Sequence, residues 1–148
     1  MKLSEHFDLA EFTASDTAVR FGIDNSLPDE LLPAALETAQ MLERIRSMLG
    51  HPVVVSSGYR CRELNDAIGS KATSDHIRAM AADIKCPEFG SAHQLAKALA
   101  PHIVELGIGQ LIYEFGSWVH VSTKIPAKAV NRVITIDRKG VRFGVQAG

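Results

Sequence analysis

Two stretches decide the fold of this chain: Ser74-Asp75-His76-Ile77-Arg78-Ala79-Met80-Ala81-Ala82-Asp83-Ile84-Lys85 and, farther along, Trp118-Val119-His120-Val121-Ser122. Residues 81–87 form a short, mostly apolar run that ends in proline, and such a run predicts a strand. The loop before them is then expected to fold back beside that strand, so that His76, Asp83 and His120 converge. Two imidazoles and one carboxylate, with a fourth position open to water, form the ligand set of a catalytic zinc ion.

A plainer interpretation of the same residues stays open. Ser74 or Asp75 can cap a helix, and a solvated His76 needs no partner. Asp83 can simply accept hydrogen bonds at the end of a strand. A single helix would also bring His76 and Asp83 onto one face, because they stand two turns apart. The spacing by itself does not choose between a metal site and these structural roles.

Further motifs stand in a fixed order around the two stretches. They are Val53-Val54-Val55-Ser56-Ser57-Gly58-Tyr59-Arg60-Cys61, then Leu64-Asn65, then Ser74-x-His76, Ala81-x-Asp83 and Trp118-Val119-His120. In this combination the chain resembles the zinc D-alanyl-D-alanine carboxypeptidase family, and most closely its small phage and prophage members, which cut peptidoglycan peptides. The resemblance runs from about Leu3 to about Thr123.

The resemblance implies a set of functional residues. His76, Asp83 and His120 are expected to bind Zn²⁺, and Arg60 is expected to hold the substrate peptide. A guanidinium is a forked, permanently charged donor that suits a carboxylate or a carbonyl. The competing role for Arg60 is a salt bridge to a nearby acid.

Three more side chains are candidates for contact with the substrate. Tyr59 is expected either in the wall of the cleft or in the core, and Trp118 is expected to pack beside the site. Ser74 is expected either to support His76 by a hydrogen bond or to act as a simple cap. Asn65, by contrast, is expected to have a structural role in the turn before the metal loop.

The chain departs from the family pattern in two places. Ala79 stands where the family usually has glycine, and alanine is poor at positive φ. Many relatives also place a glutamate or histidine base two or three residues before the last zinc ligand, where this chain has Ser117 and Trp118. The nearest carboxylate is Glu114, which a hairpin turning at Gly116 would bring close to the metal. Glu114 is therefore the candidate base, with a surface role as the alternative.

Composition narrows the class of protein. The chain has 148 residues, of which 46% are hydrophobic and 22% charged, and its net charge is −1. These values predict one globular metallopeptidase-like domain over residues 1–148, expected to be a monomer. The sequence contains no run of basic residues, so a nucleic-acid partner is not expected. It also contains no apolar stretch long enough to span a membrane. The polar start, residues 1–8, does not look like a signal peptide, so we expect synthesis in the cytoplasm and access to the cell wall by lysis, a pore or a phage particle.

The elements predicted along the chain give an α+β fold, with helices packed on a mostly antiparallel sheet that carries the zinc site. We expect a first helix capped by Ser4, a loop over residues 14–27, and a buried strand over residues 52–56. The remaining elements are helices over residues 28–49, 62–68 and 91–106, and strands over 111–114, 118–123, 130–137 and 141–145. Two cysteines do not make a disulfide framework, so Cys61 and Cys86 are expected to be free thiols.

The predicted function is zinc-dependent hydrolysis of peptidoglycan stem peptides, either at a terminal D-Ala-D-Ala or as an endolysin-like endopeptidase. Two alternatives stay open. A cysteine hydrolase with Cys61 as nucleophile lacks any local signature. An inactive, metal-containing binding or structural module, for example of a phage particle, is favoured by the missing base at Ser117.

Overall fold

A single sheet of six strands forms the centre of the computed structural model, which describes residues 1–147. The strands are β1 (Val54–Ser57), β2 (Ala81–Lys85), β3 (Gln110–Glu114), β4 (Trp118–Ser122), β5 (Val133–Asp137) and β6 (Gly140–Phe143). Their order is β1-β2-β4-β3-β5-β6, and every pair is antiparallel except β3 with β5. The predicted α+β fold with a mostly antiparallel sheet is confirmed.

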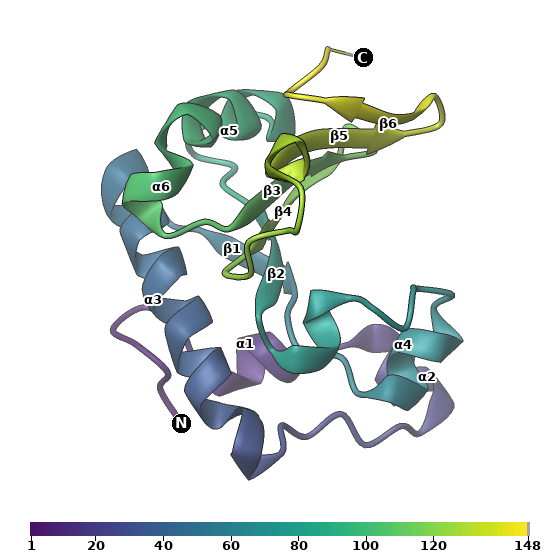
Figure 1. Cartoon of the computed structure of the whole chain (residues 1–148). Coiled ribbons are helices and arrows are strands. Elements are labelled where there is room, and N and C mark those ends of the chain that lie inside the picture. The colour runs from purple at the N-terminus through teal and green to yellow at the C-terminus, as the bar shows by residue number, and fades with distance from the viewer. Residues whose placement is uncertain (148) are drawn as a thin grey trace.

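The helices form two groups, one beside the sheet and one near the end of β1 (Figure 1). The long α3 (Leu32–Leu49) lies with α5 (Ala92–Leu99) and α6 (Ile103–Leu106) on one side, and the short α1 (Leu9–Thr13), α2 (Asp16–Phe21) and α4 (Arg62–Ala67) gather near the end of β1. Short 3-10 helices are η1 (Asp29–Leu31), η2 (Asp75–Arg78), η3 (Ala100–His102) and η4 (Ala129–Asn131). None of the helices in the described part of the chain is long and apolar enough to span a membrane.

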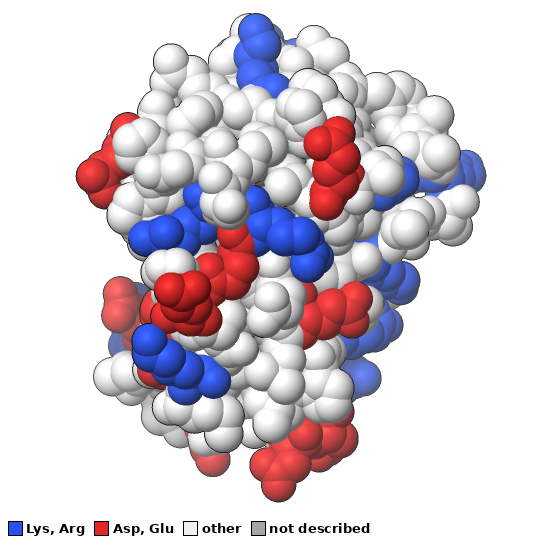
Figure 2. Space-filling view, turned by 90° about the vertical axis from the view of Figure 1, so that its left-hand side faces the viewer, with Lys and Arg blue, Asp and Glu red and all other residues white. Residues whose placement is uncertain are grey.

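The core lies between α3, α5 and the central strands. Ala39, Leu42 and Ile45 of α3 are completely buried, as are Ile84 of β2 and Val119 of β4. The apolar repeat of the long helix therefore faces the sheet, as its helical spacing predicts. On the outer side of this layer, acidic and basic side chains lie next to each other over the face that carries α3 (Figure 2).

Four local predictions were wrong. Asp8, not Ser4, caps the first helix through a capping box with Glu11, and the predicted loop 14–27 contains α2, which Ser15 caps. The strand predicted as buried is the edge strand β1, in which Val54 is 48% exposed. The last long helix is divided into α5, η3 and α6 where Pro101 follows Ala100, because proline has no N–H for a helical hydrogen bond.

Ser4 instead helps to anchor the N-terminal segment to α3. Its hydroxyl donates to Glu43 at 2.6 Å, and both the backbone N–H and the ring of His6 lie 2.7 Å from the same carboxylate. Burial alone would raise the pKa of Glu43, but these hydrogen bonds outweigh it and hold the pKa below its ordinary value. One carboxylate on α3 thus fixes the chain that leads into α1.

Replacing Glu43 with alanine should lower the free energy of unfolding by about 2 kcal/mol at neutral pH, because hydrogen bonds to a charged group are among the stronger ones. A depressed folded-state pKa means that this stability is present above the ordinary glutamate pKa and is lost as the pH falls through the folded-state value. Urea denaturation at neutral pH and at about pH 3 measures both effects. Glu37→Ala, at an exposed position of the same helix, is the control, and an equal loss in both variants would contradict the assignment.

Candidate metal centre

The pairing of two strands and one turn brings three predicted ligands together. Asp83 of β2 stands directly opposite His120 of β4, and η2 folds back over β2 with His76. His76 Nε2 lies 3.2 Å from Asp83 Oδ1, and His120 Nδ1 lies 3.1 Å from the same oxygen. The three ligand atoms lie within 4.8 Å of one another and form the one group of this kind among residues 1–147.

These three side chains are buried, and the pKa values of Asp83 and His76 are shifted from their ordinary values. His76 is 2% exposed, and Asp83 and His120 are each 7% exposed. Burial alone would raise the pKa of Asp83, but the imidazoles of His120 and His76 beside it outweigh this effect and hold the pKa well below the ordinary range. Burial lowers the pKa of His76, although Asp83 opposes the shift. An ionised carboxylate beside a neutral imidazole is the protonation pattern that binds a metal ion.

A backbone carbonyl sets the orientation of His76. Nδ1 of His76 lies 2.6 Å from the carbonyl oxygen of Gly58, so Nδ1–H is the donor and Nε2 is left free to bind a metal. Gly58 can occupy this place only without a side chain, because a Cβ there would lie 2.6 Å from the carbonyl oxygen of Phe12. The backbone N–H of Arg60 also donates to the carbonyl of His76, at 3.1 Å. The Ser-Gly-Tyr-Arg segment therefore positions the first ligand.

The turn after His76 contains Ala79, the first departure from the family pattern. Ala79 has φ 59° and ψ 25°, so it adopts the left-handed conformation expected of the family's usual glycine. This conformation costs a non-glycine residue about 1–2 kcal/mol. The buried methyl group, worth about 0.8 kcal/mol, and the smaller entropy loss of alanine on folding offset much of that cost. The first departure from the family pattern therefore leaves the turn intact.

Two supports of this turn could not be seen in the sequence. The hydroxyl of Thr38, which is completely buried on α3, donates to the carbonyl of Ala79 at 2.8 Å. Ser122, at the end of β4, donates to the carboxylate of Asp75 at 2.8 Å. Ser74 does contact His76, because its hydroxyl accepts a hydrogen bond from the backbone N–H of His76 at 3.3 Å. That contact makes Ser74 a cap of η2 as well as a support for the metal turn.

Glu114 lies at the edge of this group, as the hairpin predicts. It pairs with Trp118 across the β3–β4 turn, two residue pairs beyond Ile112 and His120. Alternate residues of a strand share a face, so Glu114 and His120 lie on the same side of the sheet. Glu114 Oε1 is 3.9 Å from His120 Nδ1. Burial raises the pKa of Glu114, with His120 and Arg60 lowering it and Asp83 raising it further. A carboxylate of raised basicity thus stands beside the ligand group.

Arg60 reaches the same group from the end of β1. Its guanidinium contacts Asp83 Oδ2 at 3.5 Å, Asn65 Oδ1 at 3.4 Å and Ser57 Oγ at 3.2 Å. The salt bridge considered as the alternative role is therefore present. Burial lowers the pKa of Arg60, while Asp83 and Glu114 raise it, and an arginine remains charged in any case. These three contacts leave some of its five N–H donors for a ligand.

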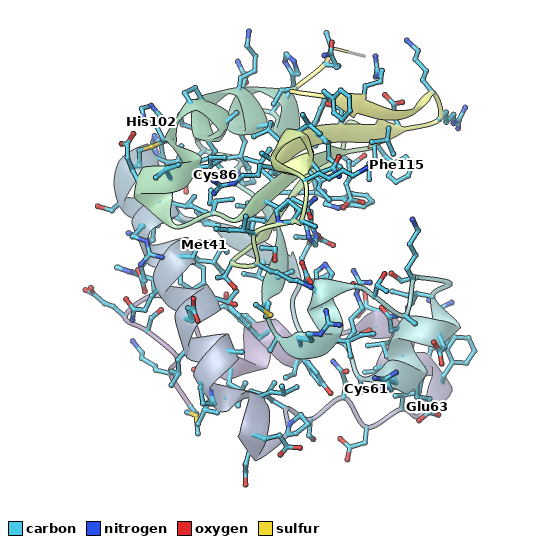
Figure 3. The ribbon with its side chains drawn as sticks, viewed as in Figure 1. Met41, Cys61, Glu63, Cys86, His102 and Phe115 are labelled. Atoms are coloured by element: carbon cyan, nitrogen blue, oxygen red, sulfur yellow. The ribbon has the colours of Figure 1, made fainter. Side chains whose placement is uncertain are left out.

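The other named residues fall into structural places. Tyr59 is 6% exposed, packs in the core and also lines the cavity beside Arg60. Asn65 is fully buried and donates to the carbonyl of Lys71 at 2.9 Å. Trp118 packs against Phe115, which lies at the outer end of the β3–β4 hairpin (Figure 3), with ring centroids 5.9 Å apart. Its indole N–H is buried and has no acceptor among residues 1–147.

The two cysteines are free and lie in different parts of the molecule (Figure 3). Cys61 is the N-cap of α4, where its sulfur accepts from the backbone N–H of Leu64 at 3.4 Å. This role explains its place after Arg60 without any catalytic function. The prediction of two free thiols is confirmed.

Comparison with known proteins agrees with this geometry. The family model described as peptidase M15 matches residues 5–122, so the chain belongs to the peptidase M15 family, the D-Ala-D-Ala carboxypeptidase family of zinc peptidases. The resemblance to this family is therefore confirmed. No curated protein matches the chain. The donor set also fits zinc, since two imidazole nitrogens and one carboxylate oxygen are typical ligands of a catalytic site with an open position.

Thr38 provides a test of how the metal turn is held. Thr38→Val keeps the shape of the side chain but removes the hydroxyl that holds the carbonyl of Ala79, and it should lower zinc affinity about tenfold, as the loss of outer contacts to a metal site does. Competition with a chelator measures the affinity. Thr38→Ser removes a methyl group but keeps the hydroxyl, so it should retain the affinity. Equal affinity in the two variants would show that the hydroxyl does not position the turn.

Proposed function

We propose that this member of the peptidase M15 family hydrolyses peptide bonds in peptidoglycan stem peptides, with Zn²⁺ held by His76, Asp83 and His120. The observation that carries the proposal is the placement of Glu114 and Arg60 around those three ligands. Zinc supplies a Lewis acid, which polarises a carbonyl group and makes water acidic near neutral pH. The side chains around it supply proton transfer and substrate orientation.

Glu114 is the proposed general base. Its Oε1 atom lies 3.9 Å from His120 Nδ1, close enough to a ligand atom to accept a proton from a water molecule that attacks the scissile carbonyl. The same carboxyl group would then donate that proton to the leaving amine. Burial raises the pKa of Glu114, which brings its basicity closer to the neutral range in which both steps must occur.

Arg60 is the proposed substrate clamp. Its side chain is only 11% exposed, and its guanidinium lies between Asp83 and the neighbouring cavity wall at Ser57. A forked donor at this place suits the carbonyl groups of a peptide or the terminal carboxylate of a stem peptide. The proposal covers both D-Ala-D-Ala carboxypeptidase and endolysin-like endopeptidase action, because the two reactions share this chemistry and differ in how far the substrate continues beyond Arg60.

An inactive binding module is the second candidate function. It is favoured by Ser117 and Trp118, which occupy the positions where many relatives carry the base. In such a module the three ligands would hold a metal ion for structural reasons only. The two candidates differ in whether the carboxylate of Glu114 matters.

Metal content is the first test of the proposal. The purified protein should contain close to one equivalent of zinc by elemental mass spectrometry. His76→Ala and Asp83→Ala should each lose it, because each removes one of three protein ligands. Absence of zinc after reconstitution at neutral pH would exclude both the peptidase and the metal-containing module.

Glu114→Gln separates the peptidase from the inactive module. The amide cannot accept a proton, so kcat for release of amine from wall peptides should fall by about 10²–10⁴-fold while zinc content is unchanged. The control is Glu88→Gln, at an exposed position after β2, which should leave kcat as it is. Full turnover in Glu114→Gln would remove Glu114 from the mechanism, and no turnover in the unmodified protein would favour the binding module.

A further inference from the structure

A cavity at the tips of two hairpins lies apart from the metal centre. Its volume is about 500 Å³, and its walls come from the end of β3, the turn that follows it and the turn between β5 and β6. The lining residues are Tyr113, Phe115, Gly116, Asp137, Arg138 and Lys139. They include neither a predicted metal ligand nor a residue of the cavity beside Arg60. Pockets for small-molecule ligands usually measure about 300–1,000 Å³, so this cavity is large enough for such a ligand.

The alternation of side chains along β3 directs Tyr113 away from the metal centre. Tyr113 and Glu114 are neighbours in this strand, so their side chains point to opposite faces of the sheet. Glu114 lies beside the ligand group, 3.9 Å from His120. Tyr113 instead stands opposite the buried Val119 and contacts the ring of His93 on α5, with ring centroids 5.5 Å apart. A ligand that reaches Tyr113 therefore contacts the face of the sheet that does not carry the metal centre.

Tyr113 brings an unpartnered polar group to this cavity. The residue is only 7% exposed, yet its hydroxyl makes no hydrogen bond with any residue in the range 1–147. The hydroxyl lies 3.7 Å from the place that a Cβ on Gly116 would take, so it is directed at the turn that lines the cavity. Tyrosine hydroxyls that are buried usually have a hydrogen-bond partner, because leaving one without a partner costs free energy. A ligand in the cavity can supply the partner that the protein does not.

The rest of the lining combines an aromatic ring with an excess of positive charge. Phe115 is 52% exposed at the outer end of the β3–β4 hairpin (Figure 3). Asp137 is compensated by the guanidinium of Arg142 and by the backbone N–H of Lys139, which donates to it at 2.9 Å. Arg138 is exposed and forms no hydrogen bond or ion pair within residues 1–147. Its guanidinium is thus a forked cationic donor of the kind that binds anionic oxygen groups.

We propose that this cavity binds a small aromatic molecule whose ring carries one hydroxyl and one anionic group. The ring would pack on Phe115, since aromatic rings attract each other in offset or edge-to-face contact. The hydroxyl would pair with that of Tyr113, and the anionic group would lie at Arg138. The inference goes beyond the proposed peptidase function and does not depend on it, because the two sites share no residue.

The test uses a naphthalene sulfonate with a hydroxyl on the second ring as the probe, beside two matched compounds. One compound lacks the hydroxyl, and in the other a methyl sulfone replaces the sulfonate and removes the charge. Calorimetry on the full-length protein gives the dissociation constants. The probe should bind about two- to tenfold more tightly than the compound without the hydroxyl, the range of one hydrogen bond. It should bind about two- to fivefold more tightly than the sulfone, the range of an exposed ion pair.

Two variants assign these preferences to residues. Tyr113→Phe should abolish the preference for the hydroxyl and keep the preference for the charge. This change removes no hydrogen bond within residues 1–147, so Tm should stay the same or rise. Arg138→Gln should reduce the preference for the charge and keep the preference for the hydroxyl. The control is Arg62→Gln, which removes another exposed arginine from α4, outside the cavity, and should change neither preference.

Three outcomes would overturn the inference. The first is that the probe does not bind. The second is that Arg138→Gln and Arg62→Gln have equal effects on the affinity for the probe. The third is a preference for the hydroxyl that persists in Tyr113→Phe. The second and third outcomes would place the probe elsewhere on the protein, for example at the metal centre.

Discussion

The carboxylate of Asp83 is the constraint on which the rest of this structure depends. It is an ionised group that is 7% exposed, and a buried charge is costly unless it is paired and hydrogen-bonded. His76, His120 and Arg60 approach it from a turn, a neighbouring strand and the end of β1. Three distant parts of the chain must therefore fold together before Asp83 is compensated. Because these partners are two imidazoles and a guanidinium, Asp83 is also part of a group that could hold a metal ion and that has a charged donor beside it.

The scaffold around Asp83 consists of rigid elements and short connections. The two strands β2 and β4 lie in the middle of the sheet, so the pairing of Asp83 with His120 is fixed on both sides by neighbouring strands. His76 lies on a short 3-10 turn, which has few internal hydrogen bonds and needs outside support. Gly58 supplies a carbonyl from one side and Thr38 a hydroxyl from the other. The turn that carries His76 is thus held by contacts from the residue after β1 and from α3, which lie elsewhere in the fold.

The sequence allowed the strands, the long helix and the convergence of the three ligands to be predicted, because these depend on local patterns and on ordered motifs. The edge position of β1 could not be predicted, since the run of valines before Ser56 has the same composition in a central strand and in an edge strand. The same limit applies to Thr38, whose partner Ala79 is 41 positions away in the chain. Helix α2 was not predicted, although Ser15 and Gly22 stand at its two ends as caps. Six residues carry too little periodicity to distinguish a helix from a loop.

The missing base two or three residues before His120 is the feature that most favours an inactive module, and the sheet itself offers an answer to it. A position on β4 two residues before His120 and the position opposite it on β3 lie on the same face of the hairpin. In this chain the β4 position is Trp118 and the opposite position is Glu114. A carboxylate can therefore move from one strand to its neighbour while it stays beside the metal ligands, without any change in the fold. Glu114 is half-buried on β3, which lies between β4 and β5, and the aromatic side chain of Trp118 occupies the opposite position on β4.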